Sequence, residues 1–250
     1  MVLILSGFLI SLIPAAVLYC WMRKYLRRDD AAYRKLCDRA MRQGVLCTFW
    51  VIAGSAAFAL LLALTGWKNS NPMTYQALHD FVVIALAEES VKFLIARRVL
   101  KKNDYPYSWL DVAAMMTLVG MGFGAAENLI LAIDSGIVPM LIRAVTIGHG
   151  GYGFVVGYFY GKGLKTNKTG YKILGFLLIW LIHGLYDFSL SEEFPAGEDY
   201  RALVAVGLAT VSLVLAIVFV VFFATARKKA VYMEPLPTVK PVEPENGGTE

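Results

Sequence analysis

Long stretches of apolar residues, separated by short polar connections, make up most of this chain. Seven of the stretches are long enough to cross a bilayer, because about 20 helical residues span its ~30 Å hydrocarbon core. The pattern therefore predicts an all-α, polytopic membrane helix bundle with about seven transmembrane helices. The expected spans are Val2–Met22, Val45–Gly66, Leu78–Leu100, Trp109–Ile133, Ile137–Tyr160, Tyr171–Leu190 and Ala202–Ala226.

Basic residues gather in alternate connections between these stretches. The connection Arg23–Gln43 holds eight Lys or Arg residues, and Arg97–Lys102 and Lys162–Lys172 hold four each. The intervening connections hold only Lys68 and Arg201 as basic residues. By the positive-inside rule, the N-terminus is expected outside and the C-terminus in the cytoplasm.

Composition agrees with a membrane location. The chain is 58% hydrophobic and only 17% charged, which is too apolar for a soluble domain. Its net charge of +5 is explained by the basic connections, so no nucleic-acid partner is expected. We expect a multi-pass protein of a cell membrane, most simply the bacterial cytoplasmic membrane, in contact with the lipid bilayer. Residues 1–226 form the expected bundle, and the Pro-rich residues 227–250 are expected to be a disordered cytoplasmic tail.

Three charged residues interrupt the apolar run Phe81–Ala96. Glu88, Glu89 and Lys92 would each cost roughly 2.5–3.5 kcal/mol near the centre of a membrane helix. On a helix Lys92 lies four residues from Glu88 and three from Glu89, so its ammonium can reach both carboxylates from one face. Two adjacent carboxylates are not expected to ionise fully together in a low dielectric, which suits a general base. The alternative is a buried salt bridge between helices.

Further polar residues lie inside three other apolar stretches: Glu127 with Asn128, then His149, then His183 with Asp187. The last two are four residues apart and so share a helix face. Counted at ~1.5 Å per residue from the outer ends of the helices, all the groups lie about 7–18 Å below the outer boundary; Glu88 is placed about 12 Å below Asp80. Helices running in alternating directions thus bring them to one level, which predicts a shared, hydrated site in the outer half of the membrane.

The ordered motifs also resemble those of a known family. Glu-Glu-x-x-Lys, Phe-x-x-x-Glu-Asn, a His in a glycine-rich helix ending Gly-Tyr-Phe-x-Gly, and His-x-x-x-Asp are similar to the PrsW family of intramembrane proteases. That family is similar in turn to CAAX-prenyl endopeptidases and bacteriocin-processing membrane enzymes, which tend to have His in place of Glu127 and Asn in place of Asp187. The likeness covers Phe81 to Phe188. It implies cleavage of membrane-anchored substrates such as anti-sigma factors at an extracytoplasmic first site. The site residues that it implies are Glu88, Glu89, Lys92, Glu127, Asn128, His149, His183 and Asp187.

The expected reaction is hydrolysis of a peptide bond in or beside a single-span membrane protein. No Gly-x-Ser-x-Gly motif or Ser–His pair is evident, and no cysteine lies near the charged cluster in the sequence, which disfavours an acyl-enzyme. Water activated by Glu88 or Glu89 is the natural alternative, with Lys92 keeping the other carboxylate ionised.

The residues suit a protease that needs no cofactor, and three alternatives remain open: a zinc protease, a transporter and an inactive scaffold. His183 and Asp187 are suited to hydrogen bonding a developing oxyanion and His149 to proton transfer, and no cofactor is then needed. The same histidines and carboxylates also suit zinc, although no His-Glu-x-x-His spacing is present. A proton-coupled transporter or an inactive scaffold would use similar residues without peptide hydrolysis.

Overall fold

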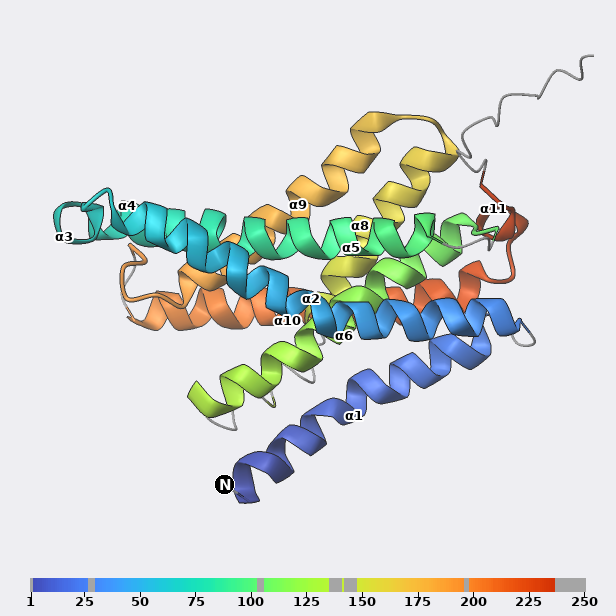
Figure 1. The fold of residues 1–250 in the computed structure, drawn as a ribbon, viewed down its shortest axis with the longest axis horizontal. Helices are drawn as coiled ribbons and strands as arrows, with labels where there is room; N and C mark the ends of the chain where they lie inside the picture. Colours follow the sequence, from blue (N-terminus) through green and yellow to red (C-terminus); the bar gives the residue numbers. More distant parts are fainter. Residues whose placement is uncertain are drawn as a thin grey trace, which may run out of the picture.

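Helices are the regular elements of the computed structural model, which describes residues 2–26, 30–102, 106–134, 141, 148–195 and 198–236 (Figure 1). Apart from the helices, these residues contain one isolated antiparallel β-bridge, between Ser108 and Pro235. The all-α prediction is therefore confirmed. The elements are α1 (Val2–Tyr25), α2 (Ala31–Ala63), α3 (Trp67–Ser70), α4 (Pro72–Leu78), the π-helix η1 (His79–Leu86), α5 (Ala87–Lys101), α6 (Trp109–Asp134), α8 (Gly148–Lys165), α9 (Thr169–Ser189), α10 (Glu198–Ala226) and α11 (Ala230–Met233).

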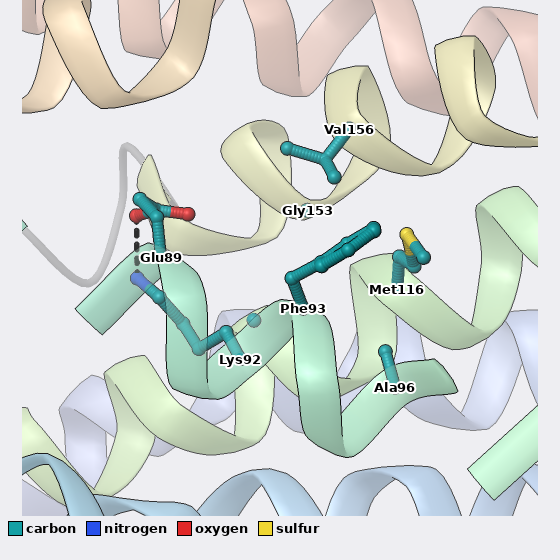
Figure 2. A pocket seen from close by; sticks show the side chains of 8 residues that line it. Glu89, Lys92, Phe93, Ala96, Met116, Gly153 and Val156 are labelled. Atoms are coloured by element: carbon teal, nitrogen blue, oxygen red, sulfur yellow. Dashed lines mark hydrogen bonds and ion pairs between the residues drawn. The ribbon is translucent and has the colours of Figure 1, made fainter. Parts of the chain in front are cut away.

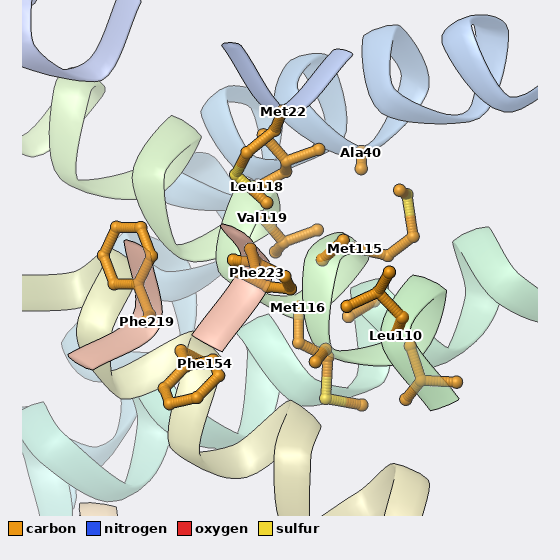
Figure 3. Close-up of a cluster of buried hydrophobic side chains, with 14 of the residues drawn as sticks. Met22, Ala40, Leu110, Met115, Met116, Leu118, Val119, Phe154, Phe219 and Phe223 are labelled. Atoms are coloured by element: carbon orange, nitrogen blue, oxygen red, sulfur yellow. The ribbon is translucent and has the colours of Figure 1, made fainter. Parts of the chain in front are cut away.

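Helix α6 forms the centre of the bundle. It packs most extensively against α8 and α2, and also contacts α1 and α5. Its residues Leu110, Met115 and Leu118 are fully buried, and side chains from α1, α2, α8 and α10 surround them. Figure 3 shows this core, in which Phe154 and Phe219 pack beside the methionine and leucine side chains of α6. A helix that is apolar on all sides belongs in such a position.

Glycines set the distance between α6 and α8. A Cβ atom at Gly120 would lie 2.1 Å from the carbonyl oxygen of His149, and one at Gly153 would lie 2.3 Å from that of Met116. No side chain larger than hydrogen fits at either position without separating the helices. Small residues allow such close backbone contact between membrane helices.

Four helices are long and apolar enough to cross a membrane, judged by length and composition: Ala31–Ala63, Trp109–Ile130, Thr169–Ser189 and Val206–Ala226. They contain most of four of the seven expected spans. Of the others, Leu78–Leu100 begins at the last residue of α4 and continues through η1 and α5, and most of the first half of Ile137–Tyr160 lies outside the described residues. Seven spans and the orientation of the termini stay predictions.

Helix α2 begins earlier than the charge pattern predicted. The expected connection Arg23–Gln43 is helical from Ala31, and the Asp30 side chain caps the helix by accepting a hydrogen bond of 2.9 Å from the Tyr33 backbone N–H. Buried Tyr33 and Cys37 pack into the core from this extension. An amphipathic stretch of helix explains the many charges that suggested a loop.

The residues before Glu88 form a π-helix instead of continuing as an α-helix. Side chains of two neighbouring helices donate hydrogen bonds to its carbonyl groups: Trp180 Nε1 to Phe81 at 2.6 Å and Ser55 Oγ to Val83 at 2.9 Å. A π-helix has wider turns and rises less per residue than an α-helix. Glu88 therefore lies nearer to Asp80 along the axis than the sequence-based ~12 Å, which assumed an α-helical rise.

The chain after α10 packs against the start of α6. Leu236 is 3% exposed and its backbone N–H donates to the Tyr107 carbonyl at 3.0 Å, while the Tyr232 ring lies 4.7 Å from that of Trp109. Residues 227–236, which the sequence assigned to the tail, thus have a packed structure because their aromatic and aliphatic side chains find partners. Residues 237–250 lie outside the described residues.

The contact between α6 and α8 predicts the effect of a single methyl group. Gly153→Ala forces the new Cβ against the Met116 carbonyl and is expected to destabilise the protein by about 1–3 kcal/mol, the usual cost of overpacking. Gly54→Ala in α2 is the matched control, because nothing lies within 4 Å of that position. Thermal unfolding of the purified protein in detergent measures both variants, and equal midpoints for the two would contradict the close contact.

Candidate active site

One face of α5 presents three charged side chains to the interior. Glu88, Glu89 and Lys92 are 6%, 4% and 6% exposed. The Lys92 ammonium lies 2.7 Å from Glu89 Oε1 (Figure 2). It lies 3.4 Å from Glu88 Oε2, so it reaches both carboxylates, as the spacing predicted. Burying an ammonium is costly unless anions satisfy it, and here two carboxylates do so.

Helix α9 brings His183 to the same carboxylates. Its Nδ1 lies 2.8 Å from Glu89 Oε1, and its Nε2 lies 3.8 Å from Glu88 Oε2. One turn later on the same face, Asp187 Oδ2 lies 3.3 Å from Nε2. Both ring nitrogens therefore face carboxylate oxygens, so the ring can hold a proton on either side.

Helices α8 and α6 complete the cluster with His149 and Glu127. His149 Nδ1 lies 3.1 Å from Lys92 Nζ, and Nε2 lies 2.6 Å from Glu127 Oε2. An ammonium can only donate hydrogen bonds, so His149 Nδ1 must accept one from Lys92. His149 Nε2 then carries the hydrogen, which it donates to Glu127. The contacts thus select one tautomer of His149.

The structure brings seven of the eight residues implied by the sequence into one connected network on α5, α6, α8 and α9. Asn128 is the exception. It is buried one residue after Glu127, but none of the hydrogen bonds found in the described residues joins its amide to the network. Successive residues on a helix point about 100° apart, and here the Glu127 side chain is the one that reaches His149.

Two aromatic side chains contact the ammonium and the imidazole rings of the site. The sequence did not assign either of them to it. Lys92 Nζ lies 4.5 Å from the centre of the Phe123 ring, whose edge meets the His149 ring at 5.0 Å between centroids. Tyr152 lies 5.3 Å from His183 and 5.8 Å from His149 by the same measure. Tyr152 follows His149 by three residues, so helical spacing was the available signal.

A cysteine also lies closer to the charged network than the sequence suggested. Cys47 of α2 is 1% exposed and packs with Phe123, the ring beneath Lys92. Its thiol donates to the Gly44 carbonyl at 3.0 Å. Sequence separation concealed this proximity, because α2 and α6 meet only in the folded bundle. The thiol is buried among apolar groups, which suits a packing role.

Four side chains of the network are of the kind that bind zinc. Glu88, Glu89, His149 and His183 each place one donor atom within 4.8 Å of the others. Three of these four also contact the Lys92 ammonium. Two unit charges 4 Å apart repel by about 4 kcal/mol even at an effective dielectric of 20, and a divalent ion doubles this. The donors fit a metal in kind and spacing, but not with Lys92 in its present place.

Comparison with known proteins gives a consistent assignment. The profile of a family described as "PrsW family intramembrane metalloprotease" matches residues 40–226. "Protease PrsW" of Oceanobacillus iheyensis is 34% identical over 153 residues, covering 56% of this chain and 70% of that protein. The proteins of the same name from Shouchella clausii and Clostridioides difficile are 27% and 25% identical and cover 75% and 76% of this chain, and 84% and 81% of their own lengths. No solved structure gives a significant match.

All seven connected site residues fall inside the matched region, and the profile covers most of the bundle. The chain belongs to the PrsW family of intramembrane proteases and is a peptide hydrolase.

Proposed function

We propose that this protein hydrolyses a peptide bond of a membrane-anchored substrate with a water molecule activated by Glu88. The supporting observation is the unequal engagement of the two adjacent glutamates. Glu89 accepts short hydrogen bonds from Lys92 at 2.7 Å and His183 at 2.8 Å, whereas the corresponding distances to Glu88 are 3.4 and 3.8 Å. Glu88 therefore keeps more of its acceptor capacity for a water molecule. Glu89 is the anchor for the Lys92 ammonium and the His183 ring.

The positions of these groups support the following reaction. Glu88 takes a proton from water while the oxygen adds to the carbonyl carbon of the scissile bond. Glu89 positions the His183 ring through Nδ1, and Nε2, which faces Asp187 at 3.3 Å, turns its hydrogen to the developing oxyanion. When the carbon–nitrogen bond breaks, the proton held by Glu88 passes to the leaving nitrogen. The products are one new carboxyl group and one new amino group. His149, held by Glu127 and Lys92, keeps the ammonium in place beside the base.

We further propose that no metal takes part. The family description names a metalloprotease, and the donor set around Glu88 and His149 has suitable chemistry. The Lys92 ammonium nevertheless contacts three of the four donors, as a bound metal would. A fixed organic cation in this place balances the carboxylates without a metal ion. Family membership favours hydrolysis over the transporter and inactive-scaffold alternatives.

The proposed substrate is a single-span membrane protein of the anti-sigma-factor type, the class implied by the family resemblance. Its scissile bond must reach Glu88, which lies about two turns from the first residue of η1, the end that the charge pattern places outside. An α-helical segment hides its carbonyl groups, so the reacting segment must be extended or frayed. Fraying is easiest at a helix end, where backbone groups already lack partners. We propose an extracytoplasmic juxtamembrane cut that leaves a membrane stub for a second protease.

Removing the base tests the assignment directly. Glu88→Gln keeps the volume of the side chain but cannot take a proton, so the rate constant for cleavage is expected to fall by about 10²–10⁴-fold. Asp80→Asn is a matched control, because Asp80 is also buried but pairs with Gln76 and His79 outside the network. Both variants are compared by product formation in proteoliposomes. If Glu88→Gln and Glu89→Gln both cleaved the substrate at the wild-type rate, the network would have no role in the reaction.

Metal dependence is tested by chelation. Because Lys92 supplies the positive charge, cleavage is expected to persist at the wild-type rate after prolonged treatment with EDTA and phenanthroline. The measurement is the initial rate before and after dialysis against each chelator. Loss of activity that added zinc restores would assign the reaction to a metal.

The position of the cut tests the depth argument. Mass spectrometry of both products from a single-span substrate is expected to place the principal cut in the extracytoplasmic juxtamembrane segment or the outer third of the span. This follows from the position in the outer half of the membrane that the sequence predicts for Glu88, and from the cost of unwinding a helix in the hydrocarbon core. A principal cut on the cytoplasmic side would show that the expected topology is wrong.

A further inference from the structure

A small cavity adjoins the charged network between α5, α6 and α8. Its volume is about 10 Å³, measured as the space open to the centre of a water-sized sphere. Glu89 and Lys92 stand at one end, and Figure 2 shows the Phe93 ring in the middle, with Val156, Met116 and Ala96 beyond it. On α5 these residues follow the spacing i, i+3, i+4 and i+7, so a single helix face leads from the network into the cavity.

We propose that this cavity is a specificity subsite, which receives the side chain of a substrate residue next to the scissile bond and selects alanine-sized side chains. The inference rests on the proposed hydrolysis at Glu88. A peptide bond held beside Glu88 and Glu89 has its flanking side chains within a few ångströms of the cavity mouth.

The lining favours an apolar occupant over a bound water molecule. A buried water typically makes about three hydrogen bonds. Here the polar groups, Glu89 and Lys92, lie at one end and are already bonded to each other at 2.7 Å, and Glu89 also accepts from His183. The remaining walls are aromatic and aliphatic side chains together with glycine backbone. A methyl group matches this surface, because it needs no hydrogen-bond partner.

The volume limits the occupant to about one methyl group. A cavity of this size holds one water-sized sphere, and the branches of valine or leucine would have to push the walls apart. The walls resist such movement. The Phe93 ring packs 5.2 Å from Tyr160 and 5.9 Å from Phe176 between centroids, and Gly120 and Gly153 are fixed by the contact of α6 with α8. The cavity is therefore preformed, as most ligand sites are.

A pool of model substrates tests the proposal with the full-length protein in proteoliposomes. Each substrate has one apolar span of about 20 residues and an extracytoplasmic juxtamembrane segment randomised among Gly, Ala, Val, Leu and Phe. Mass spectrometry of the products gives the preference at each position around the cut. For the wild type, one position beside the cut is expected to favour Ala over Leu by roughly tenfold or more, the discrimination that a tight apolar pocket provides.

Variants of the walls separate a subsite from a general effect. Met116→Ala enlarges the cavity and is expected to shift the preference at that one position toward Val and Leu by roughly tenfold. Ala96→Val fills it and is expected to shift the preference toward Gly. Met115→Ala is the matched control, since Met115 is equally buried on α6 but does not line the cavity. If Met116→Ala does not fold, Val156→Ala enlarges the same cavity from α8.

The outcomes distinguish this inference from the proposed function. Cleavage of the pool without a small-residue preference, or the same profile for Met116→Ala and Met115→Ala, overturns the subsite while leaving hydrolysis intact. Absence of any cleavage by the wild type overturns both. A shift confined to one position, in opposite directions for Met116→Ala and Ala96→Val, establishes the subsite.

Discussion

The Lys92 ammonium lies within 3.4 Å of two carboxylates and an imidazole nitrogen, in a position almost completely shielded from water. Taking such charges out of water is expensive, and removing one partner of a buried pair typically costs about 3–5 kcal/mol. The partners of Lys92 come from α5 itself and from α8, and through Glu89 it is linked to His183 on α9. These helices must therefore converge for the ammonium to be satisfied, and their convergence creates the site.

Glycines on α6 allow His149 to approach closely enough to join this cluster of charged and imidazole groups. A Cβ at Gly120 would collide with the carbonyl oxygen of His149, and one at Gly124 would lie 3.1 Å from the His149 ring. The missing side chains on α6 thus let the histidine backbone and ring approach closely enough for Nε2 to reach Glu127. The same glycine contact keeps the cavity beside Glu89 narrow. The close packing of α6 against α8 therefore also sets the position of His149 in the network.

The sequence predicted the parts of the site that depend on helical spacing. Lys92 reaches Glu89, and His183 reaches Asp187, because residues three and four apart share a helix face. Equal depth along the helices also predicted that the polar groups of different helices share one site. The sequence did not predict the individual contacts that depend on how neighbouring helices pack. The π-helix before Glu88 is tied to side chains of α2 and α9, and the aromatic contact of Tyr152 with His183 joins α8 to α9. No local pattern contains that information, since tertiary packing overrides local preference.

We propose that a fixed ammonium, and not a metal ion, organises the carboxylates and imidazoles of the proposed hydrolytic site. The most direct measurement is an experimental map of the protein in lipid, prepared with excess zinc and recorded with anomalous scattering at the zinc edge. The account predicts Lys92 Nζ in contact with Glu89 and no anomalous peak among Glu88, Glu89, His149 and His183. A peak between these four side chains, with Lys92 turned away from them, would contradict it.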